Sequence, residues 1–371
     1  MQFSTIYSRV ESLSNVTSQR ALIKDAIQIG LYRATAQDLP YLMTDGIITT
    51  VALYETGTVT ATNNSTTVTG SGTTFTAAMV GRKIRMGGDT AYYEIATFVS
   101  VTEITITAVY IGTTGGSKTF SIYKDQYRLP ADMDVYKVLR QIENASFLVD
   151  VERTAFDMVE PSPRSAGDPG YSILAGTKLD TYTTGTVSIT VNLSVLTGVG
   201  TSWLSVEGLG RGSKVTIGVY TYTVESVDSD TQITIYELAS VTATGSTYSI
   251  SLDNYIIQFH PYPDAITNIY FKYQRIPYPL INDQDIPELP DQWHHILITA
   301  GLIWAWEVKD KEESKRYELM FAQQVSEMWS RIGYISNAKR RPRQSLDEIE
   351  YWRRYSSINL PAGYGYPISY R

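Results

Sequence analysis

The most concentrated charge in the sequence is a basic stretch in its C-terminal part. Lys339, Arg340, Arg341 and Arg343 lie together in a chain whose formal net charge is −7. Such a stretch can contact the phosphates of a nucleic acid, bind an acidic protein surface or remain solvated. Coating of a nucleic acid needs a broad basic face, which an acidic chain lacks. The protein surface is therefore the favoured partner.

Aromatic side chains follow this basic stretch in the same segment. Tyrosine and tryptophan are enriched in protein interfaces, because each ring buries apolar area while its polar group stays hydrated. Glycine and proline interrupt residues 360–371, so this part cannot build its own core. We predict an extended tail over residues 336–371 that only a partner orders. Its candidate docking residues are Lys339, Arg340, Arg341, Arg343, Trp352, Tyr355, Tyr364, Tyr366 and Tyr370.

Two adjacent histidines are the residues most able to ligate a metal, because the chain has no cysteine. His294 and His295 stand near four carboxylates, but neighbouring residues on a helix point about 100° apart and do not converge on one ion. In His-Glu-x-x-His sites the histidines share one helix face. We predict a helix start with favourable acidic residues and no metal site. Those acidic residues are Asp283, Asp285, Glu288 and Asp291.

No residue pattern fixes a catalytic mechanism. Glycoside hydrolysis needs two carboxylates about 5–9 Å apart, and no motif here sets such a pair. Gly81 and the pair Gly87-Gly88 are expected in turns, because no Gly-Lys-Ser or Gly-Lys-Thr opens a helix behind them. We predict a non-enzymatic protein with no catalytic residue, no cofactor and no bound metal.

Length and composition indicate more than one folded core. The chain has 371 residues, 43% of them hydrophobic, and an ordinary domain has about 100–200 residues. No charged segment precedes an apolar one at the start, and no apolar run approaches the length of about 18 residues that a membrane span needs. We expect neither a secretion signal nor a membrane span.

A repeated pattern rich in threonine and glycine divides the chain. Residues 57–75 and 185–203 both contain Thr-Gly-x-Gly-Thr close to an aromatic residue, Phe75 or Trp203. Alternating apolar and polar residues between turn signals predict short antiparallel strands in each copy. Further aligned segments are 81–86 with 212–217, 104–107 with 233–236, and 119–122 with 247–250. We predict two small β-barrel or sandwich modules, residues 57–128 and 185–254.

Helical periodicity is found near both ends of the chain. Apolar residues from Phe3 to Leu13 recur at helical spacing, and Ser18 is expected to cap a second helix. Residues 293–308 predict a buried helix too short to span a bilayer, and residues 317–332 an amphipathic one. A helical hairpin is the simplest arrangement of these two, with one long helix as the alternative.

Alternating segments outside the modules predict further strands. Residues 135–147 and 156–182 have the composition of strands and turns. Residues 255–259 and 269–273 alternate strongly enough to predict a β-hairpin that turns at residues 260–264.

Several short motifs outside the two modules occur together in a pattern typical of one family. They are Leu-Pro-Ala-Asp at 129–132, Gly-Asp-Pro-Gly-Tyr at 167–171, Phe-His-Pro-Tyr-Pro-Asp at 259–264, the strand at 270–273, and Ile-Pro-Glu-Leu-Pro at 286–290 before Trp293. With these motifs the chain resembles the head-to-tail adaptor family of short-tailed phages, which forms the neck or connector. The repeated Thr-Gly-x-Gly-Thr pattern is likewise similar to modules of phage structural proteins.

The resemblance implies an α+β fold with a helical ring core and a small β-sheet, from which the two inserted antiparallel β modules project. The domains are then the core (1–54, 129–184 and 255–335), module 1 (57–128), module 2 (185–254) and the tail (336–371).

The resemblance also implies a function. The protein is then a structural virion protein of the neck, a homo-oligomeric ring of typically about twelve subunits. Such a ring binds the portal protein, closes the head and lets DNA pass without sequence preference during ejection. Its other partners are tail nozzle, tube or fibre proteins, it assembles in the host cytoplasm, and it has no membrane partner. The basic and aromatic tail residues become portal-docking residues under this hypothesis.

Two alternative functions remain open. The β modules can instead recognise a tail fibre or spike, which makes the chain an attachment protein. Some members of the adaptor family are described as peptidoglycan hydrolases, so a peptidoglycan-degrading tail component is the other alternative.

Overall fold

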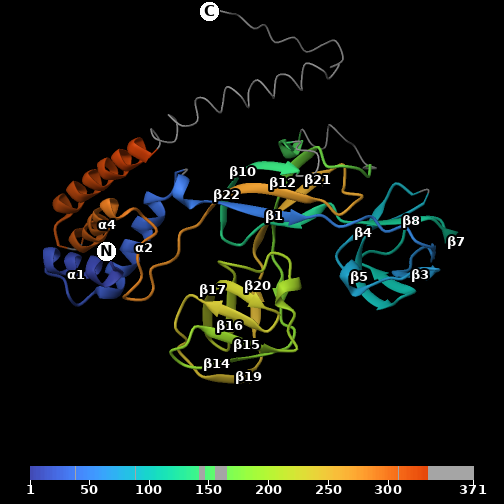
Figure 1. Cartoon of the computed structure of the whole chain (residues 1–371), viewed down its shortest axis with the longest axis horizontal. Helices are drawn as coiled ribbons and strands as arrows, with labels where there is room; N and C mark the ends of the chain where they lie inside the picture. Colours follow the sequence, from blue (N-terminus) through green and yellow to red (C-terminus); the bar gives the residue numbers. More distant parts are fainter. Residues whose placement is uncertain (38, 88, 142–146, 155–164, 308, 333–371) are drawn as a thin grey trace, which may run out of the picture. The chain divides into compact units, whose positions relative to one another are not determined.

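The computed structural model describes residues 1–37, 39–87, 89–141, 147–154, 165–307 and 309–332. The chain divides into two compact units (Figure 1), Met1–Leu42 with Pro277–Arg371, and Met43–Ile276. We call the first the helical unit and the second the sheet unit. Within the described residues, no helix combines the length and apolarity needed to cross a membrane.

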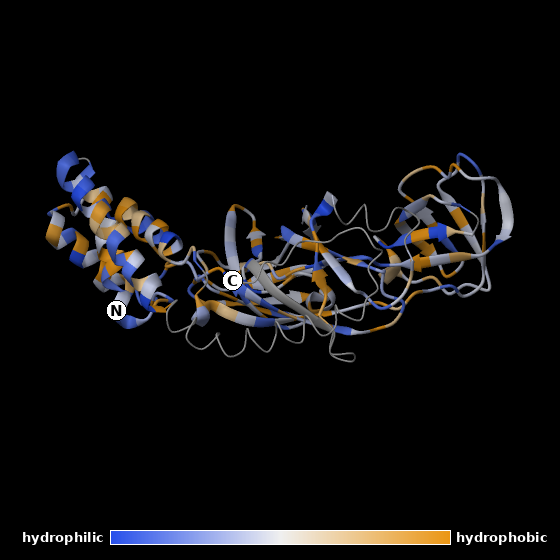
Figure 2. Cartoon of the chain, turned by 90° about the horizontal axis from the view of Figure 1, so that it is seen from above, coloured by the Kyte–Doolittle hydropathy of each residue, from blue (hydrophilic) through white to orange (hydrophobic). Residues whose placement is uncertain are grey.

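The helical unit packs around one apolar helix. Its elements are α1 (Phe3–Ser14), α2 (Arg20–Ala34), α4 (His295–Glu307), a helix over residues 311–332, and the short turns η1 (Pro40–Leu42) and η4 (Asp291–Trp293). Helix α4 buries residues on all its sides, among them Ile296, Ala300 and Leu302. Figure 2 shows the hydrophobic residues of this unit concentrated where its helices meet. Burial of that surface is the main stabilising contribution to the unit.

Glycines permit the closest helix contacts. A side chain at Gly30 on α2 would collide with Ala300 on α4, and a Cβ at Gly301 would lie 2.7 Å from Val10 on α1. Backbones can therefore approach closely at both crossings.

The helical predictions are confirmed in outline. Helices α1 and α2 occupy the predicted N-terminal segments, and α4 is separate from the helix over residues 311–332, so the hairpin interpretation is right. The predicted cap is wrong, because α2 begins at Arg20 behind Gln19, which makes no side-chain capping bond.

Two small sheets share a core in the sheet unit. The first has the order β1 (Met43–Thr49), β22 (Asn268–Arg275), β10 (Met133–Gln141). The second has the order β11 (Val149–Asp150), β12 (Tyr171–Lys178), β21 (Asn254–His260), β9 (Gln126–Arg128). Ile257 and Phe259 of β21 pack in one cluster with Ile269 and Phe271 of β22.

The predicted hairpin between β21 and β22 is wrong. Both strands exist, but β21 pairs with β12 and β9, whereas β22 pairs with β1 and β10. Seven residues, 261–267, separate the strands. A connection of this length does not force two strands to pair as a two-residue turn does, so each strand joins a different sheet.

The two larger sheets repeat one strand order. The seven-stranded sheet has the order β7-β2-β3-β6-β5-β4-β8, and the eight-stranded sheet has β13-β20-β16-β17-β18-β15-β14-β19. Reversed, the first order matches the second strand for strand, with β13 additional. The seven strands are β2 (Thr58–Ala61), β3 (Thr67–Ser71), β4 (Lys83–Met86), β5 (Tyr92–Ser100), β6 (Glu103–Ile106), β7 (Gly115–Lys118) and β8 (Phe120–Tyr123), with η2 (Ala77–Met79). The eight are β13 (Thr181–Tyr182), β14 (Thr186–Ile189), β15 (Val195–Val199), β16 (Lys214–Ile217), β17 (Tyr220–Ser229), β18 (Gln232–Ile235), β19 (Ala243–Ser246) and β20 (Ser249–Ser251), with η3 (Trp203–Ser205).

The geometry of the sheets explains the Thr-Gly-x-Gly-Thr motif. The first glycine, Gly70, leaves room for the side chain of Thr73, whose hydroxyl donates to the Val101 carbonyl at 3.1 Å. The second glycine, Gly72, has a φ of +67°, which glycine adopts without strain. In the other sheet Gly200 has a φ of +71° and Thr201 donates to the Asp230 carbonyl.

The expected helical ring core is wrong. Strands hold 36% of the residues and helices 25%, so the described chain is mostly β. Residues 129–184 and 255–276 were included in the predicted helical core, although their own alternation predicted strands, and they contribute β10, β11, β12, β21 and β22. In β22, Ile269, Phe271 and Tyr273 are buried at alternate positions, which is the period of a strand and not of a helix. The described α-helices α1, α2 and α4 and the helix over residues 311–332 all belong to the helical unit.

Candidate functional site

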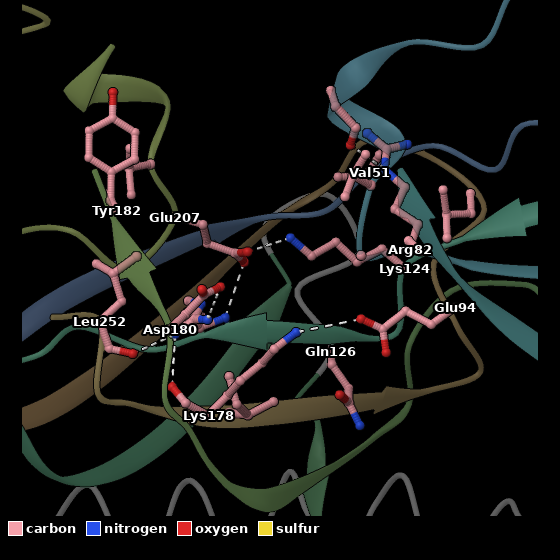
Figure 3. Close-up of a pocket in the computed structure, with 18 of the residues that line it drawn as sticks. Val51, Arg82, Glu94, Lys124, Gln126, Lys178, Asp180, Tyr182, Glu207 and Leu252 are labelled. Carbon is pink, nitrogen blue, oxygen red and sulfur yellow. Dashed lines mark hydrogen bonds and ion pairs between the residues drawn. The ribbon is translucent and has the colours of Figure 1, made fainter. Parts of the chain in front are cut away.

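A polar hollow of the sheet unit lies where three of its sheets approach one another. It has a volume of about 600 Å³ (Figure 3), and we call it the inter-sheet cleft. The seven-stranded sheet contributes Arg82 and Glu94, and β9 contributes Gln126 and Arg128. The remaining labelled residues are Val51, Lys124, Lys178, Asp180, Tyr182, Glu207 and Leu252.

Ion pairs cross the inter-sheet cleft. The ammonium of Lys124, just before β9, forms an ion pair with the carboxylate of Glu207, which lies between β15 and β16 of the eight-stranded sheet (Figure 3). Lys178 at the end of β12 lies 3.9 Å from Glu94 on β5. Exposed pairs of this kind contribute little to stability and weaken with salt. They link segments that are far apart in sequence, and they place neighbouring positive and negative charges on the lining of the cleft.

Arg128 makes the densest contacts in the cleft. Its Nη1 donates to the carbonyls of Lys178 and Leu252 at 2.9 and 2.8 Å, and its Nη2 lies 3.1 Å from Asp180 Oδ2. The side chain is only 8% exposed, although the carboxylate of Asp180 is largely solvated. The planar guanidinium with its fixed donors suits such multiple recognition. Arg128 therefore ties β9 to the two chain segments that enter and leave the eight-stranded sheet.

A buried ion pair joins β4 to the segment just before β9. Lys83 Nζ of β4 lies 2.7 Å from Asp125 Oδ2, and both side chains are largely buried. Gln258 of β21 donates to the same carboxylate oxygen at 3.0 Å. The ammonium also lies 4.7 Å from the centre of the Tyr92 ring. The pair thus joins the seven-stranded sheet to the four-stranded one.

A second buried carboxylate connects the eight-stranded sheet to β22. Asp132 accepts a hydrogen bond from the Tyr273 hydroxyl at 3.1 Å and lies 3.6 Å from Arg211 Nε. Burial raises the pKa of the Asp132 carboxyl above its ordinary value, and the nearby Arg211 opposes that rise. The neighbouring carboxylate and, above all, burial raise the pKa of Tyr273 well above its usual range.

We expect Arg211→Met to make stability more dependent on pH. Without the cation the folded-state pKa of Asp132 rises further above its unfolded value of 3.8. Stability from a raised pKa is present below the unfolded pKa and is lost as pH rises through the folded pKa. The variant should match the native protein near pH 4 and lose about 1–3 kcal/mol near pH 7, measured by urea unfolding. Adding Asp132→Asn should remove this trend, and a loss that is equal at both pH values contradicts it.

The charged side chains of the cleft bind other groups of the same chain, which suits a structural role better than catalysis. Three of its cations face carboxylates, and Arg82 donates from Nε to the Ala78 carbonyl at 3.1 Å. Burial lowers the pKa of Arg82 from its ordinary value. Among the described residues, no group of three or more His, Asp or Glu side chains is placed to hold a metal ion.

The rings of the two adjacent histidines lie in different environments. The ring of His294 is fully buried, with Nε2 2.7 Å from the Leu289 carbonyl, whereas exposed His295 has Nδ1 2.9 Å from the Gln292 carbonyl. Burial lowers the pKa of His294, which favours the neutral ring. The two rings have different partners, as expected for neighbours at a helix start.

The predicted docking residues of the tail, Lys339 to Tyr370, lie outside the described residues. Their role stays a prediction. The predicted site residues did not include Lys83, Asp125, Arg128 or Asp132, although Asp132 ends the Leu-Pro-Ala-Asp motif at 129–132. The two residues of each ion pair, Lys83 with Asp125, Arg128 with Asp180 and Asp132 with Arg211, are at least 42 positions apart in sequence. No local pattern could therefore have identified the pairs.

The eight-stranded sheet and the elements that follow it are similar to a known family. No curated protein matches the chain. A family model matches a range of the chain that begins just before β13 and includes the eight-stranded sheet, β21, β22 and α4. Residues 179–345, slightly less than half of the chain, match the family model of the SU10 adaptor protein, so this part of the chain is similar to that phage adaptor family.

Proposed function

We propose that the protein is a head-to-tail adaptor that forms a homo-oligomeric ring between portal and tail, closes the head and passes DNA during ejection. The observation that carries the proposal is the match of residues 179–345 to the SU10 adaptor protein model. This range holds strands and helices of both units, so the match is not confined to one small sheet.

The inter-sheet cleft supports a structural role. Its lysine and arginine side chains are engaged with carboxylates and backbone carbonyls of the same chain. Together with the pair of Lys83 and Asp125, these contacts fix sheets to one another instead of presenting groups to a substrate. A ring subunit needs such internal rigidity, because each subunit must present the same two surfaces to its neighbours.

Strand β1 supports assembly with further copies. Among the described residues it pairs with β22 alone, and Ile47 on it is 56% exposed. Thr50, just beyond β1, donates its N–H to the Thr267 carbonyl. Because bonding direction alternates along a strand, Ile47 and Thr49 direct their backbone groups away from β22. An open edge of seven residues can accept a strand from a neighbouring subunit.

Removal of residues 336–371 tests the portal contact. We expect the shortened chain to remain folded and to lose binding to the portal protein, because the basic and aromatic side chains of the tail are the proposed anchors. Native mass spectrometry of the full chain with portal should show a ring of about twelve subunits. Undiminished portal binding of the shortened chain, or a full chain that stays monomeric with portal present, contradicts the proposal.

A second candidate function has one supporting observation. The eight-stranded sheet and its loops expose large apolar side chains, including Val199 at 71%, Leu204 at 64% and Val219 at 89%. A binding surface on this sheet would bury such exposed apolar side chains. If this sheet attaches a tail fibre or spike, Val199→Lys with Val219→Lys should abolish fibre capture and leave the portal ring intact. Unchanged capture excludes this surface.

A further inference from the structure

The helical unit contains an apolar groove between α2, α4 and the helix over residues 311–332. The groove has a volume of about 340 Å³, within the range of about 300–1,000 Å³ of ligand pockets. Its apolar lining includes Leu22, Ala26, Ile29, Ile303, Trp304 and Phe321. Leu22 is 46% exposed and Ile29 52% exposed, so water contacts apolar surface that an occupant would cover.

The rim of this groove is acidic. Asp25, Glu307 and Glu318 border it, against one cation, Arg33. Within the described part of the chain, none of these four side chains forms an ion pair. Other acidic residues of the unit do have cationic partners, such as Asp283 with Lys24 at 2.8 Å. The groove therefore combines an apolar floor with carboxylates that are available to an incoming cation.

The occupant that fits these features is the chain's own segment 339–355. It contains Lys339, Arg340, Arg341 and Arg343, and beyond them the aromatic residues Trp352 and Tyr355. Basic side chains complement the acidic rim, and an aromatic ring buries about 150–250 Å² when it enters an apolar groove.

The segment is long enough to reach the groove. From residue 332 back to Glu318 the helix rises about 21 Å at about 1.5 Å per residue. The seven residues from 333 to 339 span up to about 25 Å when extended. Lys339 therefore reaches the level of Glu318, and the aromatic residues lie farther along the chain.

We propose that residues 339–355 bind in cis to the groove formed by α2, α4 and residues 311–332, with basic side chains at Asp25, Glu307 and Glu318 and an aromatic ring on the floor. The groove then holds the tail in the free subunit. If the tail also docks to the portal, a consequence that rests on the proposed function, portal must displace it. Ring assembly would then begin only where portal is present.

Disulfide trapping in the full chain tests the proposal without portal, so its failure is distinct from failure of portal binding. The chain has no native cysteine, which makes introduced pairs unambiguous. Leu22→Cys with Ser345→Cys should form an intramolecular disulfide about fivefold faster than Ser8→Cys with Ser345→Cys, because Ser8 is exposed on α1 away from the groove. The advantage should disappear in about 0.5 M salt.

Charge exchange supplies the matched controls. Glu307→Lys with Glu318→Lys should remove the fivefold advantage, and adding Arg341→Glu with Arg343→Glu should restore it. Glu312→Lys reverses an exposed charge on the same helix outside the groove and should leave the rate unchanged. Equal rates for both cysteine pairs, or disulfide-linked dimers in place of the intramolecular product, overturn the proposal.

Discussion

Replacing Lys83 with methionine is expected to lower the free energy of unfolding by about 3–5 kcal/mol. The substitution removes the ammonium 2.7 Å from Asp125, whose side chain is only 3% exposed, and leaves a buried carboxylate without its cation. Gln258 retains its 3.0 Å hydrogen bond to that oxygen, but a neutral amide does not replace the charge of the lysine. Urea unfolding followed by circular dichroism measures the change through the transition midpoint.

The double variant Lys83→Met with Asp125→Leu distinguishes charge burial from lost packing. Removing both partners of a buried pair is often close to neutral, so the double variant should recover most of the loss. Lys315→Met is the matched control, because Lys315 pairs with Glu312 while its side chain is 66% exposed, and it should change stability little. A double variant as unstable as Lys83→Met would show that the ion pair is not the cause.

Trp203→Ala is expected to destabilise the eight-stranded sheet by about 3–5 kcal/mol. The indole is 1% exposed, and its Nε1 donates to the Tyr248 hydroxyl at 3.0 Å inside the core of that sheet. Removal of the ring leaves a cavity and takes away the donor to the Tyr248 hydroxyl, which keeps only its own 2.7 Å bond to the Thr184 carbonyl. Hydrogen exchange of β14 to β20 should accelerate strongly, while exchange in the helical unit should stay as it was.

Two further substitutions serve as controls for the expected effect of Trp203→Ala on stability. Trp203→Phe should cost less, because Phe75 fills the corresponding place in the seven-stranded sheet, where it packs against Tyr54 and Phe120. Leu204→Ala alters the next residue, which is 64% exposed, and should have almost no effect. Comparable losses for Trp203→Ala and Leu204→Ala would contradict the core role of the indole.

Local elements could be predicted from the sequence because their signals are local. Phe3, Ile6 and Val10 recur at helical spacing and are fully buried in α1. The alternation in Lys214–Ile217 likewise matches β16, whose Val215 and Ile217 face the core. Period and burial agree in both elements, because one face must leave water.

Pairing between distant strands could not be predicted in the same way. Residues of β21 and β22 alternate like the strands of a hairpin, and only the choice of neighbours places them in different sheets. The candidate site has the same limitation. Arg128 reaches Asp180 across 52 positions, and neither residue stands in a motif. The tail prediction rests on composition, and it stays a prediction because residues 333–371 lie outside the described range.

The paired ends of the two larger sheets have an evolutionary consequence. Tyr54, before the seven-stranded sheet, exchanges backbone hydrogen bonds of 3.0 and 2.9 Å with Ile122 at its end. In the eight-stranded sheet Tyr182 is paired with Ile250 in the same way. A segment whose two ends lie side by side can be gained, lost or duplicated in a gene while the rest of the chain keeps its path. The shared strand order is what a tandem copying event would leave behind, and it makes each sheet a unit that recombination can exchange.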